Sequence, residues 1–300
     1  MKKLLLTTAF LGASLFAEVT TILPYGGEID YGADAQKTYK DKATLLGIHA
    51  TYGDLSYLIE ADYAHLQTKY ISEINHEDLK QNDFTLVYGK YYTNFMFRLG
   101  AHYVSTNDVE LGDGYVGIAT LGGYNYFGYD KLSYGTHLYY INYSDGHNEN
   151  YEKKSISILQ ATPYISYYKS LYYKAMKFYG SNTVTLKGYF QNTDDFITKN
   201  YSTFEISDAL LINKTLISAK YYNGKMRAGV KDSGMTVFNT LDEMKYGYEL
   251  KVGYYFTPSA FLSASYAQNT YREFDEVLTS PNITKDNTNQ VMLASFSYSF

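Results

Sequence analysis

The chain has 300 residues, a net charge of −5, a mean hydropathy of −0.32 and no cysteine. These values exclude a disulfide framework and thiolate chemistry, and they argue against nucleic acid as a partner, because nucleic acid requires a basic surface. The 37 tyrosines and only 4 prolines favour β-strands.

The N-terminal residues have the order of a secretory signal peptide. A positive start precedes an apolar run over residues 4–16, and Ala17 is a plausible last residue before cleavage. A buried N-terminal helix is the alternative interpretation. The run is too short for a membrane-spanning helix, and no later run reaches the necessary length of about 20 apolar residues. We expect residues 1–17 to be removed and residues 18–300 to form one domain.

Apolar and polar side chains alternate along most of the remaining chain. In residues 244–256, for example, tyrosines and aliphatic residues alternate with Lys245, Glu249 and Lys251. Successive side chains of a strand point to opposite faces, so each such segment would have one apolar and one polar face. The segments are residues 19–32, 43–52, 55–68, 83–92, 95–105, 115–127, 132–143, 155–168, 182–191, 201–212, 215–230, 244–256, 259–272 and 289–300.

The connections between these segments are alternately short and long, as in membrane barrels with short periplasmic turns and long extracellular loops. Residues 169–181 are the exception, because they are too long for a turn. They could form a short helix, extensions of two strands, or a further strand that would invert the first half. Asp208 also shares a face with apolar neighbours, so the segment 201–212 is the least regular. About 14 strands are expected, and counts of 12 or 16 stay open.

The C-terminal strand carries aromatic residues at alternate positions, Phe296, Tyr298 and Phe300. This strand resembles the C-terminal strand of Gram-negative outer-membrane β-barrels, which the barrel-assembly machinery recognises. The resemblance implies an all-β, antiparallel up-and-down transmembrane barrel in the bacterial outer membrane, in contact with lipid and lipopolysaccharide. It also implies that the three aromatic residues act as an assembly signal. The Tyr-rich, Trp-free composition is similar to that of proteins of Campylobacter-like and Sulfurimonas-like bacteria.

If the aromatic faces contact lipid, the opposite faces line the interior. The predicted pore-lining residues are Glu28, Asp30, His49, Glu60, Asp62, Arg98, His102, Lys187, Lys245, Glu249 and Lys251. Burying unpaired charges is costly, so these charges must be paired, hydrated or both. A barrel of about 14 strands is also wider than the eight-stranded kind that side chains fill. We therefore predict a water-filled or partly plugged pore, whose mixed charges give weak ion selectivity.

Porin-like proteins are the family that the chain resembles, which implies passive diffusion of small hydrophilic solutes or ions without a cofactor, in a monomer or trimer. A structural or adhesive barrel without an open pore is the alternative, since residues 70–82 and 273–288 are long enough to present a surface. A barrel hydrolase is less expected. None of the six histidines lies in the His-x-Ser-Asn-Gly setting of outer-membrane phospholipases. We expect no enzyme activity.

Two predicted extracellular loops carry acidic clusters that could chelate a cation through oxygen ligands. The clusters are Asp108, Glu110 and Asp113, and Asp145, His147 and Glu149. Barrel loops are ordinarily polar and solvated, so we favour solvated loops and predict no metal site.

Overall fold

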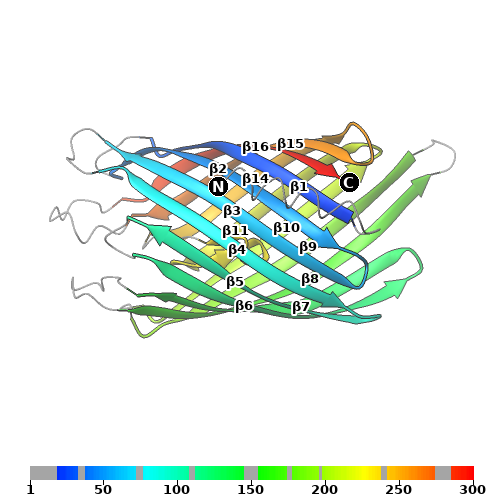
Figure 1. Cartoon of the computed structure of the whole chain (residues 1–300), viewed down its shortest axis with the longest axis horizontal. Coiled ribbons are helices and arrows are strands. Elements are labelled where there is room, and N and C mark those ends of the chain that lie inside the picture. Colours follow the sequence, from blue (N-terminus) through cyan, green and yellow to red (C-terminus); the bar gives the residue numbers. More distant parts are fainter. Residues whose placement is uncertain are drawn as a thin grey trace, which may run out of the picture.

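The computed structural model describes residues 19–32, 38–71, 77–107, 112–144, 155–173, 178–195, 198–237, 242–273 and 285–300. Within these residues, fourteen antiparallel strands close into one barrel, which confirms the predicted fold class and strand count (Figure 1). The strands are β1 (Val19–Asp30), β2 (Lys40–Gly53), β3 (Tyr57–Tyr70), β4 (Leu79–Tyr91), β5 (Phe95–Thr106), β6 (Gly114–Phe127), β7 (Asp130–Tyr143), β8 (Ile156–Tyr173), β9 (Phe178–Asn192), β10 (Asn200–Ile212), β11 (Thr215–Met226), β14 (Glu243–Tyr255), β15 (Ala260–Arg272) and β16 (Asn287–Ser299).

The barrel closes where β1 pairs with β16. Tyr25 lies opposite Ser295 of β16 on one side and opposite Gly47 of β2 on the other. The Phe300 N–H also donates to the Thr20 carbonyl (2.9 Å). The barrel sheet therefore has no edge strand, and its backbone hydrogen-bonding groups are satisfied between neighbours, as a membrane-spanning sheet requires. The strand ends that flank the long connections lie at one end of the barrel, and most short turns lie at the other (Figure 1).

Most of the irregular stretch 169–181 belongs to two long strands, β8 and β9. β8 and β9 run past their neighbours until only residues 174–177 separate them, with Leu171 opposite Gly180 at this end. The prediction of extended strands is therefore confirmed, and the predictions of a helix or a further strand are wrong. The stretch is rich in tyrosine, a residue with high strand propensity, so pairing between β8 and β9 continues beyond the neighbouring strands.

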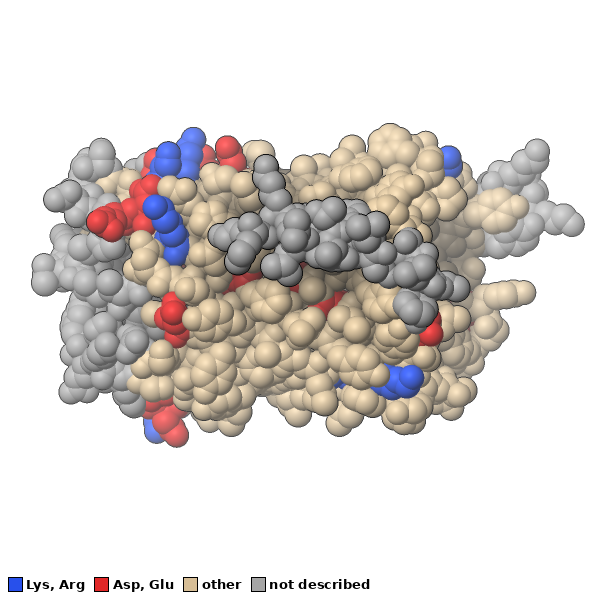
Figure 2. All heavy atoms as spheres, viewed as in Figure 1, with Lys and Arg blue, Asp and Glu red and all other residues tan. Residues whose placement is uncertain are grey.

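Apolar side chains cover the outer surface of the barrel. Leu46, Leu121 and Val252 are 59%, 63% and 55% exposed, and every strand contributes comparable residues. Figure 2 shows a middle region that is mostly uncharged, with charged side chains gathered mainly toward the ends. Asp208 faces outward, as predicted, and accepts a hydrogen bond from Asn182 Nδ2 (2.6 Å). Such a surface suits a hydrocarbon environment.

Residues 227–237, which follow β11, fold into the barrel interior. They form β12 (Val230–Lys231), the 3-10 turn η3 (Asp232–Gly234) and β13 (Thr236–Val237). We call residues 227–237 the luminal segment. The predicted strand 215–230 therefore ends early, at Met226. Among the described residues, no helix is long and apolar enough to cross a membrane.

Candidate functional site: the barrel lumen

Strand register identifies the side chains that face the lumen. Directly paired residues of neighbouring strands point to the same side of a sheet, and the Tyr25 hydroxyl donates to Asp62 across β2 inside the barrel (2.9 Å). The predicted residues that share this inner face are His49, Glu60, Asp62, Arg98, His102, Lys187, Glu249 and Lys251. That they line a path for solutes stays a prediction.

Glu28 and Asp30 lie on the outer face, so their prediction as pore-lining residues is wrong. Glu28 pairs directly with Met292, whose side chain is 58% exposed on the outside. Asp30 accepts a hydrogen bond from the Gly32 N–H at the end of β1 (2.9 Å). The aromatic face of β1 points inward because the Tyr25 phenol serves as a donor to Asp62. Alternation alone does not show which face of an amphipathic tyrosine strand meets lipid.

Lys245 lies at the rim. It occupies a register shift between Met244 and Tyr246, near the start of β14. Its Nζ contacts Asp286 (2.7 Å), which also pairs with Arg272 (2.8 Å). The expected strict alternation fails at this irregularity, and the residue joins a rim ion cluster.

The luminal segment is held against the wall by two glutamines. Gln160 Nε2 donates to the Val230 carbonyl (2.7 Å), and Gln160 Oε1 accepts from the Val230 N–H (3.0 Å). Gln191 makes the same two hydrogen bonds with Arg227. Its Nε2 donates to the Arg227 carbonyl (2.9 Å), and its Oε1 accepts from the Arg227 N–H (3.1 Å). Gln160 and Gln191 are paired across β8 and β9 and bond each other (3.2 Å). Each glutamine satisfies the backbone of one buried residue as a neighbouring strand would.

Apolar packing reinforces this attachment. Ala228 and Val230 are fully buried in a cluster with inner-face residues of β4, β6, β7, β8 and β10, and Met235 packs against the same cluster. Ala228 and Asp232 adopt positive φ angles of 43° and 48°. Such angles are unfavourable for residues other than glycine, so the surrounding contacts must hold the segment in its conformation.

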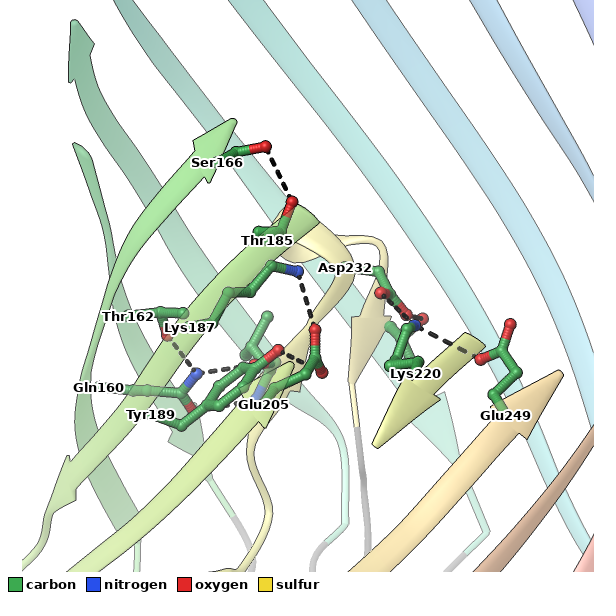
Figure 3. A network of polar contacts seen from close by, with 12 residues as sticks. Gln160, Thr162, Ser166, Thr185, Lys187, Tyr189, Glu205, Lys220, Asp232 and Glu249 are labelled. Atoms are coloured by element: carbon green, nitrogen blue, oxygen red, sulfur yellow. Dashed lines mark hydrogen bonds and ion pairs between the residues drawn. The ribbon is translucent and has the colours of Figure 1, made fainter. Parts of the chain in front are cut away.

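A second set of contacts lies on the inner faces of β9, β10, β11 and β14 and reaches the segment at Asp232 (Figure 3). Lys187 pairs with the buried Glu205 (3.2 Å), and Glu205 also accepts from the Tyr189 hydroxyl (2.9 Å). Lys220 lies between Asp232 of the segment (3.2 Å) and Glu249 of β14 (3.4 Å). The Lys220 ammonium thus links the luminal segment to the wall, and the Lys231 ammonium of the segment lies 3.3 Å from the centre of the Tyr222 ring of β11.

Polar groups on β2–β5 are also engaged with one another. Arg98 pairs with Glu60. His102 contacts Asp83 through Nε2 (3.1 Å) and the Thr85 hydroxyl through Nδ1 (2.6 Å). Asp62 accepts from Tyr25 and lies 3.4 Å from His49. The predicted mixture of paired charges is therefore present in the lumen.

Exposure divides the lumen into two walls. The inner faces of β4–β8, which we call the packed wall, are nearly closed to solvent: Thr85, His102, Thr120, His137 and Thr162 are 0–5% exposed. The middle inner faces of β14, β15, β16, β1 and β2, which we call the open wall, are mostly half-exposed. Their half-exposed residues include His49, Thr51, Lys251, Ser265, Ala267, Asn269, Asn289 and Ser295. The luminal segment packs on the first wall and leaves the second accessible.

A buried ion cluster lies at the long-loop end. Lys40 Nζ is 2.5 Å from Asp242 and 3.9 Å from Glu273. Glu273 also accepts from the Tyr39 N–H (3.2 Å). Burial is the largest cause that raises the pKa of Glu273 to about 7, with Asp242 adding to the shift and Lys40 opposing it. The cluster ties the return of the β11–β14 connection to β2 and β15.

The sequence interpretation missed Gln160, Gln191, Lys220 and Asp232. The first three lie on the polar faces of predicted strands, and this position was the signal in the sequence that they face the lumen. Asp232 fell in a predicted extracellular loop, and nothing in the alternation showed that this loop turns inward.

Most of the two acidic loop clusters lies outside the described residues. Asp113 is described, and it accepts from the Tyr103 hydroxyl (3.1 Å) and the Thr106 N–H (2.8 Å). No group of three or more His, Asp or Glu in the described ranges could hold a metal ion. Phe296, Tyr298 and Phe300 face outward with 42–63% exposure, and their role as an assembly signal stays a prediction.

No protein-family model and no curated protein matches the sequence. Solved structures resemble it along most of its length. The CymD monoaromatic hydrocarbon channel is 8% identical, with a TM-score of 0.49 and 95% of this chain and 89% of that chain covered. OccAB1 of Acinetobacter baumannii is 7% identical, with a TM-score of 0.48 and coverage of 94% and 97%. The NanC porin is 10% identical, with a TM-score of 0.48 and coverage of 92% and 98%. At these values the function must be argued from the residues of this chain.

Proposed function

We propose that the protein is a channel of the bacterial outer membrane through which small hydrophilic solutes diffuse passively. The observation that carries the proposal is the open wall: a closed barrel with an apolar exterior keeps half-exposed inner-face residues along β14–β16, β1 and β2, with polar ones such as Ser265 and Asn269 beside apolar ones such as Leu293. Polar groups that remain accessible inside a membrane barrel provide a hydrated path.

The side chains on the outer surface of the barrel support the proposed location in a membrane. Exposed apolar side chains occur on every barrel strand, and aromatic residues cluster beside the short turns, among them Tyr92, Phe95, Phe127, Phe256 and Phe300. Aromatic girdles and an apolar band are what a barrel needs in contact with lipid and lipopolysaccharide.

Insertion of the purified full-length protein into planar lipid bilayers tests the proposal. We expect stepwise current increases of uniform size that persist at low voltage. Purified, correctly folded protein that never produces current steps would contradict it.

A structural barrel without an open path is the second candidate, because the luminal segment fills part of the interior and is fully buried at Ala228 and Val230. The same recording separates the two functions, since a closed barrel gives no steps. Release of the luminal segment would then be needed before current appears.

A further inference from the structure

Lys251 differs from the other lysines of the lumen wall. Lys187 and Lys220 each contact a carboxylate. In the described part of the chain, Lys251 has no carboxylate partner and no aromatic ring against its ammonium. Strand register places it on the inner face of β14, and it is half-exposed in the open wall. Its charge is therefore available to a solute.

Hydroxyl groups flank this ammonium on both sides. Ser218 of β11 and Ser265 of β15 lie directly opposite Lys251 in the sheet, and both are half-exposed. Directly paired residues have Cβ atoms about 4.5–5.5 Å apart, so the three side chains form one group. Gly253, the next inner-face residue of β14, has no side chain, and the ring of Phe261 from β15 lies against it.

The nearby carboxylates are already engaged. Glu249, the adjacent inner-face residue of β14, pairs with Lys220. Asp62 on the neighbouring part of the wall is 6% exposed, and Tyr25 and His49 contact it. Among the described residues, Glu249 and Asp232 share the ammonium of Lys220, so an anion that passes along the open wall would meet the unpaired charge of Lys251 beside carboxylates that are already paired.

We propose that Lys251, Ser218 and Ser265 form an anion-binding step that favours small carboxylates bearing hydroxyl groups. The inference rests on the proposed channel function and names its solute class. The ammonium provides charge-assisted hydrogen bonds to a carboxylate, and the serine hydroxyls can donate to or accept from solute hydroxyls. The site is half-exposed and contains one charge, so binding is weak enough for the solute to leave again.

Bilayer recordings of the full-length protein test this step with three probes: gluconate as a hydroxylated carboxylate, propionate as a carboxylate without hydroxyls, and sorbitol as an uncharged polyol. In wild type, the reversal potential in a KCl gradient should indicate a preference for chloride. Gluconate should reduce the current at lower concentration than either other probe.

Lys251→Met should move the reversal potential toward cation preference and weaken the block by gluconate about fivefold, the effect of losing about 1 kcal/mol of a partly solvated ion pair. Lys251→Arg should retain the block. Lys225→Met is the control for the charge change, because Lys225 lies in the register irregularity at the end of β11, is 61% exposed and pairs with Glu243 (3.1 Å), away from Lys251.

Folding of each variant is checked by the heat-dependent change of gel mobility that folded barrels show. If Lys251→Met does not fold, Lys251→Gln is measured in its place. Channels whose selectivity and gluconate block are unaffected by the loss of Lys251 would overturn the inference and leave the channel function intact. Equal block by propionate would overturn the role of the hydroxyls. Absence of channels in wild type would overturn the proposed function as well.

Discussion

The packed wall and the open wall belong to one continuous sheet and have the same alternating strands, yet they differ in what covers them. The packed wall is covered by the luminal segment, which buries Val116, Ile118 and Ile141 almost completely. The open wall keeps small polar residues such as Ser265 and Asn269 half-exposed. A barrel of this width cannot be filled by its own wall side chains. A connecting segment supplies the missing filling on one side only.

The difference also concerns how the filling is held. The glutamines of β8 and β9 bind the backbone of the segment, and this recognition does not depend on ion pairs. Lys220 adds a charged link through Asp232, and Lys231 and Arg227 of the segment lie over the rings of Tyr222 and Tyr201. We infer that the position of the luminal segment is set mainly by buried hydrogen bonds and apolar packing, and only secondarily by charge.

Removing the glutamine contacts should have the largest effect. The double variant Gln160→Leu/Gln191→Leu leaves the backbone groups of Val230 and Arg227 without these partners, at a cost of about 1–3 kcal/mol for each buried group. The luminal segment should then leave the packed wall, and the single-channel conductance should rise severalfold. Gln290→Leu, a matched change at an exposed position of β16, should leave the conductance unchanged. A conductance equal to wild type in the double variant would show that the segment does not restrict the path.

The buried ion pair between Lys187 and Glu205 can be tested through the thermal stability of the protein. Glu205→Leu leaves Lys187 without its carboxylate, and breaking a buried pair in this way costs about 3–5 kcal/mol. We expect a clearly lower Tm in detergent, followed by circular dichroism. The double variant Lys187→Met/Glu205→Leu should recover part of the loss because no uncompensated charge remains. An unchanged Tm for the single variant would contradict the burial of this pair.

The buried ion cluster of Lys40, Asp242 and Glu273 should make stability depend on pH. The pKa of Glu273 is raised to about 7 in the folded protein, so the folded state retains a proton that the unfolded state releases near pH 4.5. The stabilisation is therefore fully present below about pH 4.5 and is lost as the pH rises to about 7, by up to about 3 kcal/mol.

In wild type, Tm should consequently fall between pH 5 and pH 8. Glu273→Gln, which cannot ionise, should show a smaller fall over the same interval. The same pH dependence in both proteins would assign it to other groups.

The smallest effect is expected at Glu28. Glu28→Leu removes a charge from the outer face near the end of β1, where such a charge costs at most about 1 kcal/mol in a membrane. Reversal potential and conductance should match wild type, and Tm should be equal or slightly higher. A changed reversal potential would indicate that Glu28 faces the lumen and would contradict its position on the outer face.

Alternation and connection length were sufficient to predict the barrel, because a two-residue period reports the two environments of each strand. The eight predicted ionisable residues that do face inward lie in stretches of strand where the register is regular. Glu28 and Asp30 were assigned to the wrong face because β1 places tyrosine in the lumen, where its hydroxyl has a partner. Lys245 was misplaced by a register shift, which has no signature in the alternation.

The luminal segment could not be predicted for a different reason. Its position depends on Gln160 and Gln191, which are 70 and 36 residues from their backbone partners. Local sequence patterns do not indicate the contact of Gln160 with Val230 or that of Gln191 with Arg227. A polar sequence between two strands is typical of an exposed loop.

The division into packed and open walls can be measured directly because the chain contains no cysteine. Single cysteines would replace Ser265 and Ala267 on the open wall and Thr85 and Thr120 on the packed wall, and a charged, water-soluble thiol reagent would be added during bilayer recording. We predict rapid labelling and a stepwise loss of current for Ser265→Cys and Ala267→Cys, and little labelling for Thr85→Cys and Thr120→Cys. Equal labelling of both walls, or faster labelling at Thr85 and Thr120, would contradict the account.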